Sequence, residues 1–263
     1  MIEPLRAVAM AGWASADEPW LVVTEHRADT RIPDVVLARL GEEAVADRIA
    51  MGCRRPLRRL ELGALLALRS DCGTALEAVA SQTYVMPASI RRTLRMLEHD
   101  GFVVQTSRGN WRRTLRLRPL VSRFVSFEAK RSDWRRALAQ ARAHRLFSNE
   151  AYVAFDQRFA GRFERHLPYY RTSGIGLLAL GPEPSTVRRL LRGTPGRPLD
   201  PVSALLAGEE IWARLIGVTR QLPQTRLPSA AARTSDRAEP QLVGVDARRL
   251  GRLISALARP APA

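Results

Sequence analysis

One short stretch combines an acid with the single lysine of the chain. The segment FVSFEAKRSDW, residues 124–134, contains Glu128 and Lys130, and every other basic residue among the 42 in the chain is an arginine. A partly buried lysine can change its protonation state, whereas arginine effectively never loses its proton. A lysine retained against so strong a preference for arginine indicates a chemical role at this position.

A carboxylate much earlier in the chain can join this pair. Period-two alternation along residues 124–130 puts Glu128 and Lys130 on one face of a strand. Asp34 lies in another apolar run, IPDVVL. If residues 45–120 are an insertion, the two strands become consecutive in one sheet. Two carboxylates and a lysine at a sheet edge suit metal-assisted phosphodiester hydrolysis, because Mg²⁺ prefers oxygen ligands and activates bound water.

Each of these residues has a simpler interpretation when it is taken alone. Glu-x-Lys is a common tripeptide that a solvated ion pair would explain, and Asp34 could merely begin a turn. Glu25, in VVTEH, is either a further ligand or base at the same site or an exposed carboxylate at a strand end. The occurrence of Asp34 and of the Glu128–Lys130 pair on strands in the expected order favours the catalytic interpretation.

The apolar periodicity predicts the elements that must position these side chains. A helix is expected in IEPLRAVAMAGW and a hairpin in PWLVVTEH and IPDVVLARL. After residue 120, VSRFVSFEAK, EAYVAFD and GIGLLALG have strand patterns, and SDWRRALAQARAHRLFSN has a helix pattern. The order helix-strand-strand and then strand-helix-strand predicts one α/β sheet divided by the intervening segment.

That segment has a different pattern. PLRRLELGALLALRS, GTALEAVASQTY and MPASIRRTLRMLEHDG predict three helices, and FVVQTSRGNWRRTLRLR predicts two short strands around a turn. Three helices followed by a basic hairpin resemble the winged helix-turn-helix family over about 60 residues, where the third helix enters the major groove and the hairpin lies on the backbone. The resemblance implies DNA contacts by Ser89, Arg91, Arg92 and Arg95 on the helix and by Arg108, Trp111, Arg112 and Arg113 on the hairpin. For Trp111, packing within its own module is the alternative.

Pro33-Asp34 and Glu128-Ala129-Lys130 together resemble the signature of the PD-(D/E)XK nuclease superfamily. The resemblance implies that Asp34 and Glu128 hold Mg²⁺ or Mn²⁺ and that Lys130 positions or activates the attacking water. Gln140-x-x-x-His144 is similar to the Gln-x-x-x-Tyr of an exonuclease-like branch. It implies a role for Gln140 and, since histidine replaces tyrosine, a weaker one for His144.

The expected fold is a restriction-endonuclease-like mixed α/β sheet flanked by helices, interrupted by a winged-helix domain and followed by a helical extension. STVRRLLRG and PVSALLAGEEIWARLIG are expected to be helices, and DARRLGRLISALAR a short basic one. The expected divisions are 1–44 and 121–182 for the nuclease-like domain, 45–120 for the insertion, 183–220 for the helical extension, and 221–263 for a linker and the basic helix.

Charge indicates the class of partner. The net charge is +16 with a pI near 11.4, and residues 54–145 contain 20 basic against 7 acidic residues. Genomic base bias also enriches arginine, but this concentration in one region favours a surface for a polyanion such as DNA. Two cysteines require neither a zinc site nor a disulfide. No membrane span or signal peptide is expected, so a cytoplasmic protein is anticipated, with a homodimer as one expected state.

The sequence therefore predicts a DNA-binding, metal-dependent nuclease directed by a winged helix. The alternative is a transcriptional regulator or structural DNA binder whose nuclease-like domain is catalytically inactive.

Overall fold

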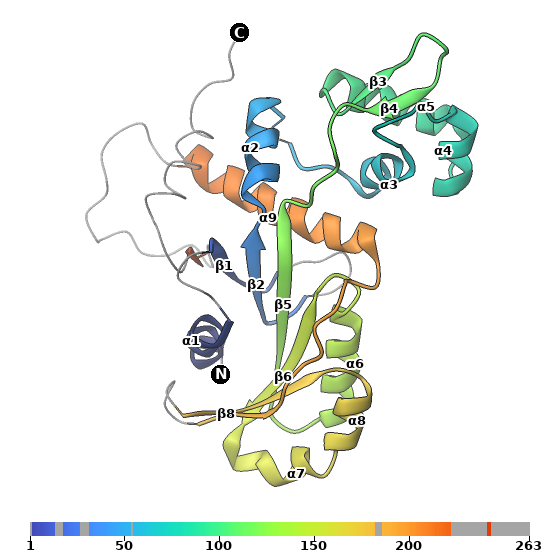
Figure 1. Ribbon diagram of the computed structural model, residues 1–263. Helices are drawn as coiled ribbons and strands as arrows, with labels where there is room; N and C mark the ends of the chain where they lie inside the picture. Colours follow the sequence, from blue (N-terminus) through green and yellow to red (C-terminus); the bar gives the residue numbers. More distant parts are fainter. Residues whose placement is uncertain are drawn as a thin grey trace.

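A seven-stranded mixed sheet forms the centre of the computed structural model (Figure 1), which describes residues 2–13, 18–26, 32–53, 55–181, 186–221 and 241–242. The strand order is β8-β7-β6-β5-β2-β1-β9, with β5, β6 and β7 parallel and the other neighbours antiparallel. The predicted α/β class is confirmed. The strands are β1 (Trp20–Thr24), β2 (Val35–Leu40), β5 (Val121–Lys130), β6 (Glu150–Asp156), β7 (Gly176–Leu180), β8 (Val187–Leu191) and β9 (Gln241–Leu242).

Helices cover both faces of this sheet. They are α1 (Ile2–Trp13), α6 (Trp134–His144), α7 (Ala160–Glu164), α8 (Leu167–Thr172) and α9 (Pro201–Gln221), with a 3₁₀ turn, η1 (Gln157–Phe159), after β6. On one face, Leu5 of α1 belongs to the same buried cluster as Phe127. On the opposite face, Ala141 of α6 clusters with Val153, and Ile211 of α9 clusters with Phe124. No helix in the described ranges is long and apolar enough to cross a membrane.

One predicted element is wrong. STVRRLLRG was expected to be a helix, but Val187–Leu191 form the edge strand β8, antiparallel to β7. Leucine and arginine favour helices intrinsically. Here Val187, Leu190 and Leu191 pack on the sheet clusters while Arg188 and Arg189 are exposed, so tertiary pairing overrides the local preference. The predicted linker and the basic helix in DARRLGRLISALAR lie almost entirely outside the described residues.

A helical module lies between β2 and β5 in the chain. Its elements are α2 (Glu42–Ala50), α3 (Arg59–Ala67), α4 (Leu76–Thr83), α5 (Pro87–His99), β3 (Val103–Gln105) and β4 (Trp111–Arg113). The sequence patterns did not predict α2. Buried Leu65, Leu94 and Trp111 join α3, α5 and β4 in one core cluster. In Figure 1, α3, α4, α5 and the β3–β4 hairpin (cyan to green) lie beyond the starting end of β5.

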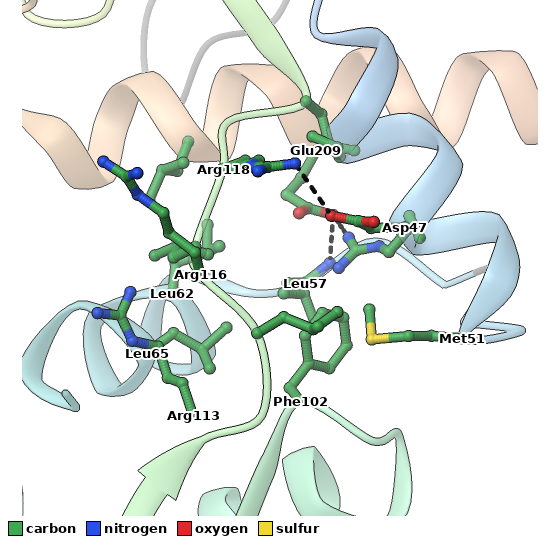
Figure 2. Close-up of a pocket in the computed structure, with 16 residues that line it drawn as sticks. Asp47, Met51, Leu57, Leu62, Leu65, Phe102, Arg113, Arg116, Arg118 and Glu209 are labelled. Atoms are coloured by element: carbon green, nitrogen blue, oxygen red, sulfur yellow. Dashed lines mark hydrogen bonds and ion pairs between the residues drawn. The ribbon is translucent and has the colours of Figure 1, made fainter. Parts of the chain in front are cut away.

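A buried ion pair joins this module to the sheet. Arg48 of α2 and Glu209 of α9 are paired, with side chains 4% and 6% exposed. The Leu57 backbone N–H donates to the same Glu209 carboxylate at 2.8 Å. Figure 2 shows Leu57 and Glu209 at this place. They adjoin a cavity of about 60 Å³, and the Arg48 guanidinium lies 4.8 Å from the Phe102 ring centre. One carboxylate therefore ties α2, α9 and the start of α3 together.

Replacing Glu209 by alanine should lower the free energy of unfolding by about 3–5 kcal/mol, because the Arg48 charge stays buried without its partner. Urea denaturation of the whole chain measures this. The control is Glu43→Ala, which removes a carboxylate 77% exposed and paired with Arg118 at 2.6 Å. That change should cost under about 1 kcal/mol. An equal loss of unfolding free energy in the two variants would contradict the inference that the buried Arg48–Glu209 pair holds α2 and α9 together.

The turn after α4 has a constrained backbone. Tyr84 has φ 54° and ψ 37°, the left-handed conformation. The Val85 N–H donates to the Ala80 carbonyl and the Tyr84 N–H to the Ser81 carbonyl, which is the Schellman pattern of helix termination. Glycine usually occupies the position of Tyr84, since a side chain there costs about 1–2 kcal/mol.

His26 is a buried histidine that follows β1. Its ring is fully buried, with ring centres 6.2 Å from both Phe124 and Phe147. Burial, reinforced by the charge of Arg214, lowers the pKa of His26 to about 3. The folded protein therefore holds this imidazole neutral.

Stability should therefore fall as the pH falls below about 6.5, where His26 takes up a proton only in the unfolded chain. The free energy of unfolding should decrease by up to about 1.4 kcal/mol per pH unit from this residue, down to pH about 3. His26→Phe should flatten the curve in urea titrations between neutral and acidic pH. His99→Gln is the control, because that side chain is 91% exposed. Parallel curves for wild type and His26→Phe would refute this role.

Candidate active site

The register of β2 against β5 brings the two predicted carboxylates together. Val35 pairs with Phe127 in antiparallel fashion, so the preceding Asp34 lies opposite the following Glu128. The Asp34 carboxylate accepts a hydrogen bond from the Ala129 N–H at 2.7 Å. A contact between residues 95 positions apart thus fixes Asp34 at the end of β5.

Glu128 and Lys130 form a close pair at that end. The Lys130 Nζ lies 2.6 Å from Glu128 Oε1, and the two side chains are 25% and 2% exposed. Burial raises the pKa of Glu128, and the negative charge of Asp34 adds to this, while the hydrogen bond from Lys130 opposes it. Glu128 Oε2 has no hydrogen-bond partner among the described residues. A buried carboxylate oxygen that accepts no hydrogen bond is suited to a cation.

Helix α6 supplies two further predicted side chains, Gln140 and His144. Asp133 caps it by accepting a hydrogen bond from the Arg136 N–H at 2.9 Å, so α6 begins immediately after β5. His144 Nε2 lies 3.8 Å from Glu128 Oε2. Gln140 is one turn earlier on the same side of the helix, and its buried Oε1 has no hydrogen-bond partner in the described part of the chain. The structure thus brings His144 to Glu128, although the resemblance in sequence implied only a weaker role for it.

Glu25 lies beside Asp34, immediately after the end of the neighbouring strand β1. Its N–H donates to the Asp34 carbonyl at 3.2 Å, and its own carbonyl accepts a hydrogen bond from Arg214 at 3.2 Å. Its φ of 48° is unusual for a residue other than glycine, and its side chain is exposed. Strained backbone of this kind concentrates at functional sites, so a role for Glu25 stays a prediction with local support.

The donor set fits a hard cation better than a transition metal. Within the described residues no group of three or more histidine, cysteine, aspartate or glutamate side chains could hold a metal ion. Structural and catalytic zinc sites need three or four such ligands. Mg²⁺ is commonly held by one or two carboxylates, with water and phosphate completing its shell, and Asp34 with Glu128 supplies that number.

Arg136 influences the candidate site, although the sequence analysis did not identify it. The positive charge of Arg136 opposes the rise in the pKa of Glu128. Its position in the first turn of the helix that follows Lys130 could have indicated that it lies near Glu128. Because the chain contains so many arginines, this position did not distinguish Arg136 from the others.

The predicted DNA-contacting residues of α5 lie on its exposed side. Ile90, Leu94 and Leu97 are buried, whereas Ser89, Arg91, Arg92 and Arg95 are all exposed. Arg95 pairs with Glu98 at 2.7 Å and lies over the Trp111 ring. Within the described ranges, neither Arg91 nor Arg92 has an ion-pair partner, so their charges are available to a ligand.

The hairpin residues divide between two sides. Arg108 and Arg112 are exposed. The prediction of a DNA contact by Trp111 is corrected, because its ring is 2% exposed and packs in the module core. Arg113, two residues on, shares that inward side of β4, and Figure 2 shows it beside the cavity near Leu65. Burial lowers the pKa of Arg113, whose side chain is half-buried, and its contact with DNA stays a prediction.

Comparisons of the chain with protein families, with curated proteins and with solved structures found no match.

Proposed function

We propose that this chain is a DNA-binding, metal-dependent nuclease of the PD-(D/E)XK type, directed to DNA by a winged helix-turn-helix module. The observation that carries the proposal is the placement of Asp34 opposite Glu128, with Lys130 paired to Glu128 at the same strand end. Each short motif alone has a simpler explanation. Their meeting across the inserted helical module is the arrangement that phosphodiester hydrolysis requires.

The order and packing of the elements support this fold assignment. The chain runs α1-β1-β2-β5-α6-β6 once the helical module is set aside, with β1, β2 and β5 antiparallel and β6 parallel to β5. That order corresponds to the core implied by the signature residues. Within the module, α3, α4 and α5 are followed by the β3–β4 hairpin, as in a winged helix, and α5 exposes its arginines.

Each side chain has a distinct role in the proposed reaction. Asp34 and Glu128 would hold Mg²⁺ or Mn²⁺, which when bound lowers the pKa of water and neutralises charge on the phosphate. The Ala129 N–H fixes the Asp34 carboxylate, and the Lys130 ammonium orients Glu128 while adding positive charge where the phosphate must approach. Activation of the attacking water would in addition require Lys130 to change its protonation state, which arginine effectively never does.

A binding protein without catalysis is the second candidate. The favouring observation is that Glu128 Oε1 and Asp34 Oδ2 are already engaged by Lys130 and by the Ala129 N–H. These internal contacts engage one oxygen of each carboxylate without a metal ion, as expected of a nuclease-like site that has lost its catalytic function. Under this alternative, α5 binds DNA and the sheet serves as a platform.

The two candidates predict different outcomes for Glu128→Gln, Asp34→Asn and Lys130→Met in metal-dependent cleavage of plasmid and single-stranded DNA. If the nuclease proposal holds, each change should reduce cleavage by about 10²-fold or more, since it removes charge from the reacting site. DNA binding should remain near the wild-type value.

The matched control is Glu150→Gln, which changes another carboxylate 2% exposed on the adjacent strand, paired with Arg123. It should retain cleavage, provided that circular dichroism shows a folded chain. Metal-dependent cleavage that persists unchanged in all three site variants would contradict the assignment of the site. No cleavage by wild type, with intact DNA binding, would support the binding-protein alternative.

DNA binding should depend on the free charges of α5. Arg91→Ala combined with Arg92→Ala should weaken duplex binding and reduce the slope of log affinity against log salt by about 1.8, or 0.9 for each phosphate that is no longer neutralised. Fluorescence anisotropy over a salt series measures both. Arg171→Ala is the control, since that arginine is exposed on α8, away from the module. An identical salt slope in the double variant and wild type would exclude α5 as the binding helix.

A further inference from the structure

We propose that Tyr84 and Met86 form an apolar tip that contacts thymine methyl groups in the major groove and so gives this protein a preference for A·T base pairs. The inference rests on the proposed DNA binding by α5. It adds a determinant of sequence preference at residues other than the predicted DNA contacts of α5 and the hairpin.

The tip consists of two large apolar side chains that face solvent immediately before α5. Tyr84 is 96% exposed and Met86 is 74% exposed. Val85, between them, packs against the module core instead. The packing of Val85 anchors this segment to the module. Its two neighbours, Tyr84 and Met86, therefore point outward from a backbone that is held in place.

The backbone at Tyr84 favours a functional reason for the tyrosine. Its left-handed conformation closes the Schellman turn, where glycine or asparagine is ordinarily found. The Tyr84 side chain makes no hydrogen bond or aromatic contact within the described part of the chain. Strain that internal packing does not offset indicates a side chain retained for an external ligand.

The surroundings of the tip indicate which ligand. Its neighbour is the first turn of α5, which contains no acidic residue and includes the exposed Ser89, and the exposed Arg91 and Arg92 follow directly in the second turn. A positively charged helix start beside apolar groups complements a polyanion that also presents apolar groups. In duplex DNA, the apolar group on the floor of the major groove is the C5 methyl of thymine.

A hollow of about 590 Å³ lies to the side of the tip, lined by Leu66, Thr83 and Val85 among others. Self-association through this hollow is the alternative to DNA binding by the tip. Arg59 lines this hollow, whereas α5 presents the exposed side chains of Arg91, Arg92 and Arg95, so the charges favour DNA bound along α5.

Deoxyuridine provides a direct test, because it removes only the methyl group from thymine. Wild-type full-length protein is titrated by anisotropy with an alternating dA·dT duplex of about two helical turns and with the same duplex containing deoxyuridine. Each methyl group buried contributes enough to change affinity by about fourfold. We expect wild type to bind the thymine duplex at least that much more tightly.

Tyr84→Gly and Met86→Ala, singly and together, should reduce or abolish this discrimination. Tyr84→Gly should keep or raise the Tm, because glycine accepts the left-handed conformation. A loss of thymine preference in a variant at least as stable as wild type separates recognition from folding. Leu199→Ala is the matched control, since Leu199 is an apolar side chain 69% exposed outside the module, and it should retain the preference.

Equal binding of both duplexes by wild type overturns the inference, as does a preference that persists in the double variant. If the Arg91 and Arg92 changes still weaken binding in those cases, the proposed DNA-binding function stands without the thymine contact. If wild type binds no duplex, both proposals fail. A variant that changes only the oligomeric state in size-exclusion chromatography assigns the tip to self-association and overturns the inference.

Discussion

The pairing of β2 with β5 is the constraint on which the candidate site depends. Asp34 and Glu128 meet only because Val35 pairs with Phe127, and a shift of the register by one residue would turn Glu128 to the opposite face of the sheet. Buried apolar residues on both faces of β5 resist such a shift. The geometry of the candidate site therefore depends on the packing of the sheet, with Asp34 just before the start of β2 and Glu128 and Lys130 at the end of β5.

The same arrangement explains how the chain accommodates an insertion between two paired strands. The module leaves from the end of β2 and returns at the start of β5, at the opposite end of these strands from Asp34 and Glu128. The ion pair of Arg48 with Glu209, together with the Leu57 N–H, fixes the module to α9. DNA held by α5 would thus be oriented relative to the sheet by a buried charge pair, whose geometry is more demanding than apolar contact.

Two residues other than glycine have positive φ among those described, Glu25 and Tyr84. The first lies beside Asp34 in the candidate site, and the second forms the tip next to α5. Both side chains are exposed, so packing does not offset the strain. One strained residue therefore lies at each of the two proposed sites, Glu25 at the candidate metal site and Tyr84 at the proposed DNA contact.

Local patterns in the sequence determined most elements that position the site, because period-two and helical spacing of apolar residues follow directly from the backbone geometry of strands and helices. The prediction of a helix in STVRRLLRG was wrong, since β8 is set by pairing with β7 and not by its own propensities. Burial of Trp111 was likewise decided by the module core. Only the tertiary structure could bring Asp34, Glu128 and His144 within reach, because contacts between residues distant in the chain depend on register and packing that no short segment contains.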